Sequence, residues 1–94
     1  MIKTFADKRT EALFIEARAT RVASDLARRA FRKLEAIHAA TRIDDLKVPP
    51  GNRLEALRGN RRGQHSIRVN DQWRLCFRFV EGDAYDVEFC DYHA

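Results

Sequence analysis

The chain has 94 residues, enough for one domain with one hydrophobic core and too few for a second. Eighteen lysines and arginines outnumber fourteen aspartates and glutamates, which gives a formal net charge of +4. Arginines supply most of this charge, and their planar guanidinium groups suit bidentate contacts with phosphate. The composition therefore favours a nucleic-acid partner, although an acidic protein would satisfy the same charge.

The two cysteines, Cys76 and Cys90, form neither a CxxC motif nor a Cys/His spacing typical of zinc, so we expect no metal site. Free thiols suit the reducing cytosol. The first nine residues contain no long apolar run, which argues against a signal peptide and against a membrane span. These features predict a cytoplasmic protein.

The amino-terminal half predicts a short strand followed by two helices. Residues 2–5 alternate as a strand that would add to a sheet, and Asp7 can cap the helix that follows. The second helix is longer and should begin at Ser24 or Asp25 and end near Ala40. Its buried stripe is expected to comprise Leu26, Ala27, Ala30, Leu34 and Ile37.

Cations cover much of the outer surface of the second helix. They are Arg28, Arg29, Arg32 and Lys33. Such a charge run is usually a solvated helix face, and the alternative is a docking surface for RNA or for a protein partner. The pattern alone leaves both interpretations open. His38, near the end of the same helix, is expected to have a structural role.

The middle of the chain loses helical periodicity. Two prolines and a glycine at residues 49–51 forbid a continuing helix or a central strand. Residues 53–58 resume an extended pattern, and residues 59–63 form a basic loop bounded by two glycines. The side chains of Arg61 and Arg62 in this loop are candidate phosphate contacts.

Three alternating patterns in the last third of the chain predict consecutive antiparallel strands over residues 65–69, 73–80 and 85–92. Turn-forming residues at 81–83 should join the last two strands. The expected register pairs Phe79 with Tyr85, Phe77 with Val87, Leu75 with Phe89 and Arg78 with Asp86. This register is self-consistent, because apolar residues face apolar residues and charge faces countercharge.

A three-residue turn over residues 70–72 should join the first two of these strands. This turn pairs Val69 with Trp73, Ile67 with Leu75 and Arg68 with Arg74. Like charges directly opposite one another destabilise a sheet unless an anion lies between them. Asp86 and Glu88 could supply part of that anion for Arg68 and Arg74, and a bound phosphate could supply the rest.

The stretches PPGNRLEAL and GQHSIRVNDQWR and a terminal Asp-Tyr-His resemble the HigB branch of the RelE superfamily, which includes the GraT-like toxins. The resemblance covers most of the chain and is most specific from residue 49 to residue 93. It implies one compact α+β domain spanning residues 1–94. In this fold two N-terminal helices pack on an antiparallel-rich sheet of four to five strands, and the patterns alone predict the same order of elements.

Proteins of this family are toxins of type II toxin-antitoxin pairs that cleave messenger RNA, in the best-studied cases on the ribosome. The resemblance therefore implies an endoribonuclease that inhibits translation and growth. It implies metal-free cleavage, without a cofactor, by attack of the ribose 2′-OH on the adjacent phosphate. It also implies a cognate helix-turn-helix antitoxin of the HigA type, with operator DNA contacted only through the toxin-antitoxin complex.

The terminal motif of the family aligns with Asp91, Tyr92 and His93. His93 is the expected acid or base, since an imidazole titrates close to working pH. Asp91 would orient that imidazole or take a proton itself, and Tyr92 would stack on a base or bind a phosphate oxygen. Arg74 matches the family's arginine after the aromatic residue of the central strand. We expect it to stabilise the charge that develops on the phosphate.

One part of the chain departs from the family pattern. HigB proteins commonly carry the pattern K-L-H-P-L-K-G where this chain has R-L-E-A-L-R-G at residues 53–59. Arg58 keeps the positive charge, but Glu55 replaces the imidazole. A carboxylate can act as a base, yet it also repels phosphate, so we expect a weak or more selective nuclease. The RNA-binding candidates are Arg58, Arg61, Arg62, Arg68 and Arg78.

Two other functions are compatible with the residues. A RelE-fold protein could bind the ribosome or its antitoxin while cleaving little or no RNA. A DNA-binding regulator that acts alone is less favoured, because the chain contains no helix-turn-helix pattern with a glycine-containing turn between paired helices.

Overall fold

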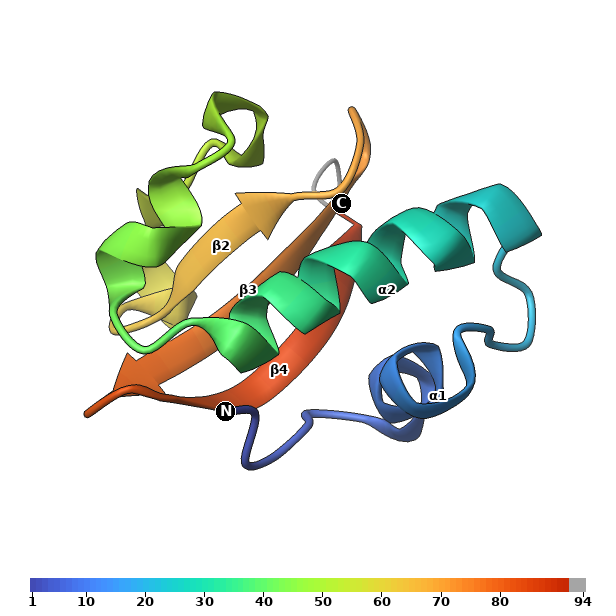
Figure 1. Ribbon diagram of the computed structural model, residues 1–94, viewed down its shortest axis with the longest axis horizontal. Coiled ribbons are helices and arrows are strands. Elements are labelled where there is room, and N and C mark those ends of the chain that lie inside the picture. The colour runs from blue at the N-terminus through green and yellow to red at the C-terminus, as the bar shows by residue number, and fades with distance from the viewer. Residues whose placement is uncertain (92–94) are drawn as a thin grey trace.

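The computed structural model describes residues 1–91 as a layer of helices packed on one antiparallel sheet (Figure 1). Helices α1 (Lys8–Glu16) and α2 (Ser24–Ala39) lie on one side of the sheet. The strands, in their spatial order, are β1 (Glu55–Ala56), β2 (His65–Arg68), β3 (Trp73–Val80) and β4 (Asp83–Asp91). The architecture is the α+β arrangement that the sequence predicts.

The chain forms three short 3₁₀ turns between α2 and β2, two of them before β1 and one after it. They are η1 (Ile43–Lys47), η2 (Pro50–Asn52) and η3 (Gly59–Arg61). Leu46 of η1 is buried in the core, and the amide of Asn52 in η2 donates to the carbonyl oxygens of Leu46 and Val48. These contacts hold the irregular segment against the sheet. None of the helices in residues 1–91 is long and apolar enough to cross a membrane.

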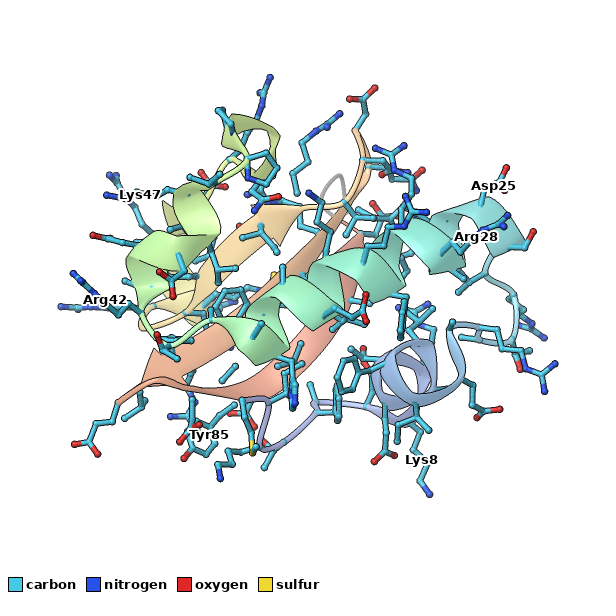
Figure 2. All side chains as sticks on the ribbon, viewed as in Figure 1. Lys8, Asp25, Arg28, Arg42, Lys47 and Tyr85 are labelled. Carbon is cyan, nitrogen blue, oxygen red and sulfur yellow. The ribbon has the colours of Figure 1, made fainter. Side chains whose placement is uncertain are left out.

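The two helices begin in different ways. As predicted, Asp7 caps α1: its carboxylate accepts hydrogen bonds from the backbone N–H and the hydroxyl of Thr10, each at 2.7 Å. The predicted cap of α2 is wrong, because the N-cap residue is Ala23 and no side chain caps the helix. Asp25 turns outward instead and binds Arg28 at 2.9 Å (Figure 2).

The core lies between the helices and one face of the sheet. Four of the five residues of the predicted α2 stripe are fully buried, and Leu26 is partly buried. The sheet contributes Ile67, Leu75, Phe77, Val87 and Phe89. Because side chains alternate along a strand, the polar residues between these apolar ones lie on the opposite face of the sheet.

The first residues of the chain run along the outer edge of β4, where they make two isolated bridges instead of a continuous strand. Ile2 bridges to Ala84 and Phe5 bridges to Val87, both in parallel orientation. His38 supports this segment, because its Nδ1 atom accepts a hydrogen bond from the backbone N–H of Ile2 at 3.1 Å. The structural role expected for His38 is confirmed by this contact.

The register of β2 and β3 is the predicted one. Ile67 lies opposite Leu75, and Arg68 lies opposite Arg74. The three-residue connection closes with two hydrogen bonds, from the backbone N–H groups of Val69 and Asn70 to the carbonyl oxygen of Trp73. The apolar alternation alone was sufficient to set this pairing, since a slip of one residue would turn every side chain to the wrong face.

The register of β3 and β4 is correct at Leu75 and Phe89 but wrong near the turn. The turn has two residues, both with positive φ, and it places Arg78 opposite Tyr85 rather than Asp86. A bulge at Asp86, whose φ is 54°, then restores the expected register further along β4. Phe79 therefore lies opposite Ala84, and Tyr85 does not share the face of Val87.

Replacing Asp7 by alanine should lower the free energy of unfolding by about 1 kcal/mol, because α1 loses its cap. Asp25→Ala is the matched control, since Asp25 stands at the start of α2 without capping it. It should cost less than about 0.5 kcal/mol, as is usual for a substitution on the surface. Urea denaturation measures both values, and equal losses would contradict this account of the two helix starts.

Candidate active site

The sheet face turned away from the helices carries a connected set of polar residues. The strand register arranges them in two adjacent rows across the sheet. One row contains Glu55, Ser66, Cys76 and Glu88, and the other contains Arg68, Arg74 and Cys90. The register therefore brings together two of the predicted catalytic residues, Glu55 and Arg74, with Arg68 beside them.

Arg74 occupies the centre of this face and is only 6% exposed. Its Nε donates to the hydroxyl of Ser66 at 2.8 Å. One terminal nitrogen donates to the carbonyl oxygen of Arg53 at 2.7 Å and to that of Ser66 at 3.3 Å. A buried guanidinium requires such acceptors, because an unsatisfied charge is costly to remove from water. The contacts hold the positive charge in one orientation.

Glu55 provides the carboxylate of the site. Its Oε1 lies 3.8 Å from a terminal nitrogen of Arg74. The two side chains differ in accessibility, because that of Glu55 is 45% exposed and that of Arg74 is 7% exposed. A substrate can thus reach the carboxylate from solvent while the guanidinium remains fixed beneath it. A fixed cation beside an accessible carboxylate is suited to proton transfer next to a phosphate.

The ion pair expected between Arg78 and Asp86 forms, whereas Arg61 and Arg68 pair with acids that were not predicted for them. Asp86 binds Arg78 at 2.9 Å, and Glu88 binds Arg61 at 3.1 Å. The prediction that these two carboxylates offset the charge of Arg68 and Arg74 is therefore wrong. Arg68 instead pairs with Asp71 in the β2–β3 turn. The bulge moves Arg78 opposite Tyr85, yet the carboxylate of Asp86 still contacts Arg78.

The basic loop around η3 folds toward the polar face. Arg61 is half-buried, and its contact with Glu88 links the loop to β4 across the width of the sheet. Arg58 and Arg62, on either side of η3, are exposed. Other cations lie elsewhere: Figure 2 shows Arg42 and Lys47 extending outward from η1. The positive charge is thus partly gathered near Arg74 and partly dispersed.

Asp91 is the last residue of β4 and lies next to this region, but the alternation of the strand places it on the opposite face of the sheet. It lies opposite Trp73 and follows the alternation of Phe89, whose side chain is in the core. Its carboxylate accepts a hydrogen bond from the side-chain amide of Gln72 at 2.9 Å. Tyr92 and His93, the other two residues of the predicted terminal motif, lie outside the described residues.

Two functional groups escaped prediction. Ser66 could have been found, because period-two alternation places it on the face of Arg74. The carbonyl of Arg53 could not, since its position depends on a left-handed residue, φ 46°, at the end of η2. A tertiary arrangement of this kind leaves no pattern in the sequence.

Lys33 of α2 contacts η2, the turn that precedes β1. Its ammonium group donates to the side-chain oxygen of buried Asn52. Burial lowers the pKa of Lys33, and the positive charges of Arg29 and Arg68 lower it further. Lys33 is therefore near enough to Arg68 of β2 for the two positive charges to interact. In residues 1–91 no group of three or more His, Cys, Asp or Glu side chains is arranged to hold a metal ion.

The fold belongs to a known class. The solved YoeB-YefM complex from Staphylococcus aureus matches all of this chain and 99% of its own chain, with a TM-score of 0.63. At 15% sequence identity this likeness shows the fold, which is that of the RelE-like toxins. The family described as the RelE-like toxin of type II toxin-antitoxin system HigB matches residues 3–93.

Two relatives agree with this family match. Toxin HigB-1 from Vibrio cholerae is 45% identical over 89% of this chain and 90% of its own length. Endoribonuclease HigB from Proteus vulgaris is 38% identical over 99% of this chain and 100% of its own length. The chain therefore belongs to the HigB-like family of type II toxins, as its sequence predicts.

Ser66→Ala should lower the free energy of unfolding by about 1–3 kcal/mol, because the buried Nε of Arg74 loses its acceptor. The matched control is Ser24→Ala at the exposed start of α2, where no side-chain cap is lost. That change should cost less than about 0.5 kcal/mol. Chemical denaturation of both variants checks the difference. Similar small losses would mean that Ser66 does not anchor Arg74.

Proposed function

We propose that this protein is a ribosome-dependent endoribonuclease that cleaves messenger RNA and thereby inhibits translation and growth. Membership of the HigB-like family supports this proposal, as does the name of the Proteus vulgaris relative, Endoribonuclease HigB. The single observation that carries it is the fixed guanidinium of Arg74 beside the accessible carboxylate of Glu55. A rigid cation next to a proton acceptor meets two requirements of phosphate cleavage.

The proposed reaction is attack of a ribose 2′-oxygen on the adjacent phosphorus. A base removes the 2′-OH proton, the new P–O bond closes a 2′,3′-cyclic phosphate, and the bond to the 5′-oxygen breaks. An acid then protonates that leaving oxygen. Cationic groups stabilise the negative charge that gathers on the non-bridging oxygens. Every step uses protein side chains, so the proposed chemistry requires no metal and no cofactor.

The proposed roles of Glu55 and Arg74 follow from their exposure, and those of Asp91, Tyr92 and His93 follow from the family resemblance. Glu55 is reachable from solvent and serves as the base, while buried Arg74 supplies the fixed positive charge. His93 serves as the acid, with Asp91 orienting it and Tyr92 holding a base or a phosphate oxygen. The RNA backbone would be bound by Arg58, Arg61, Arg62, Arg68 and Arg78.

The proposed partners are a ribosome carrying messenger RNA and a cognate antitoxin. A type II toxin is paired with an antitoxin by definition of its family. We propose that this antitoxin is a helix-turn-helix protein of the HigA type and that operator DNA is contacted only through the complex. A gene for such a protein next to this one would support the assignment, and co-purification of the two products would test it.

Glu55→Gln should reduce the rate of cleavage by about 100-fold, because the amide cannot accept the 2′-OH proton. The assay mixes the protein with ribosomes and messenger RNA and counts new RNA 5′ ends. Glu81→Gln is the matched control, since Glu81 is exposed in the β3–β4 turn, and it should cleave at the wild-type rate. If Glu55→Gln also cleaves at that rate, Glu55 is not the base.

Expression without an antitoxin should slow growth, and the double change Asp91→Ala with His93→Ala should relieve the arrest. Growth curves and protein levels measured together provide the check. A double variant that is expressed normally and stays fully toxic would remove both residues from the proposed mechanism.

Glu55 also favours one alternative function, because a carboxylate repels phosphate where an imidazole would not. In that alternative the protein binds the ribosome or its antitoxin and cleaves little RNA. Growth arrest with intact transcripts would support it. New 5′ ends that appear only with ribosomes would support the nuclease.

A further inference from the structure

We propose that Cys76 and Cys90 form a two-thiol site that binds one trivalent arsenical, bridging β3 to β4 on the sheet face that carries Arg74. Neither cysteine has a role in the proposed cleavage, and both are free thiols. They stand on adjacent strands within the two polar rows described above. The inference rests on strand register, accessibility and the charges around the thiols.

The register makes the two thiols diagonal neighbours on one face. Cys76 lies opposite Glu88, and Cys90 lies two residues beyond Glu88, opposite Arg74. Side chains two residues apart on a strand point to the same face, so both sulfur atoms project from the polar side of the sheet.

A diagonal pair in an antiparallel sheet is usually about 7–8 Å apart between Cα atoms, which exceeds the usual reach of a disulfide. A single arsenic atom bonded to both sulfurs lengthens the link by one atom and one bond. The geometry therefore fits an arsenic bridge better than a direct sulfur–sulfur bond. The regular β3–β4 pairing from Trp73 to Cys76 holds the two cysteines at this spacing, and the bulge begins just beyond Cys76.

Accessibility gives the site an entrance and a closed end. Cys90 is half-buried, whereas Cys76 is only 2% exposed. A hydrogen bond from Cys90 lowers the pKa of Cys76, and the positive charge of Arg61 lowers it further. Thiolates are the reactive form of cysteine. The same contact and burial raise the pKa of Cys90. An arsenical would thus enter at Cys90, the more accessible thiol, and reach Cys76 beneath it.

The reaction balances without an oxidant or a reductant. An aryl arsenoxide carries one arsenic–oxygen double bond. Two S–H bonds and that arsenic–oxygen bond break, two arsenic–sulfur bonds form, and the oxygen leaves as water with the two thiol protons. Arsenic stays trivalent throughout. The adduct therefore gains the mass of the arsenoxide less one water, and it consumes both free thiols.

Phenylarsine oxide is the probe, added to the full-length protein at equal concentration. We expect one adduct per chain by intact mass and no thiol that reacts with Ellman's reagent. The adduct should survive 2-mercaptoethanol and be released by 2,3-dimercaptopropanol, as expected of two sulfurs on one arsenic. Two adducts per chain, or a thiol still reactive after saturation, would overturn the proposal.

Cys76→Ser and Cys90→Ser separate a two-thiol site from two independent thiols. Each variant should lose its adduct in 2-mercaptoethanol, because only one arsenic–sulfur bond can form. If the fold preforms the site, phenylarsine oxide should also bind the folded wild-type chain at least about tenfold more tightly than the chain unfolded in urea. Equal affinity in the two states would mean that the fold does not build the site, whether or not the serine variants are stable.

The consequence for activity rests on the proposed function. Cys90 lies directly opposite Arg74, so the bound aryl group would occupy space over the candidate active site. The bridged protein should lose at least tenfold in cleavage of ribosome-bound messenger RNA and recover on release by the dithiol. Cleavage at the full rate by the bridged protein would refute this coupling. If the untreated protein does not cleave messenger RNA at all, the proposed nuclease function is refuted. The two-thiol site is not, because the mass measurement does not depend on cleavage.

Discussion

The burial of one positive charge organises this protein. Arg74 lies within the sheet, where its guanidinium must find acceptors to offset the loss of water. The acceptors come from β2, through Ser66, and from the segment before β1, through the carbonyl oxygen of Arg53. The arginine therefore ties three parts of the chain together, and the same contacts prevent it from turning away. A cation held in this way is ready for a developing negative charge without reorganisation.

The two faces of the sheet divide the work of stability and function. The helices cover one face with an apolar core, so that face cannot carry chemistry. The other face gathers Glu55, Arg74 and the two cysteines within two neighbouring rows. Its charges are balanced locally, as in the pair of Arg61 with Glu88, and this reduces the repulsion between cations at close range. An incoming phosphate would meet a surface whose positive groups are already oriented.

The bulge in β4 shows how a local irregularity serves the wider arrangement. The two-residue turn places the strands one residue out of the register that the core requires. The extra residue at Asp86 corrects this offset, so that Leu75 still meets Phe89. The same residue contacts the amino-terminal edge, where its N–H donates to the hydroxyl of Thr4. Core packing, turn geometry and the edge contact are satisfied together because the bulge absorbs the mismatch.

The sequence by itself determined the class of fold, the family, the cap of α1, the buried stripe of α2 and the β2–β3 register. Each of these depends on neighbours along the chain or on a repeated motif, and such patterns are local. Only the tertiary structure decided the β4 bulge, the uncapped start of α2 and the acceptors that hold Arg74. The bulge and the acceptors of Arg74 arise where segments distant in sequence meet and compete for the same space or the same hydrogen bond. The carbonyl of Arg53 illustrates the reason: every residue but the last has the same backbone group, and only the folded chain selects which one meets the guanidinium.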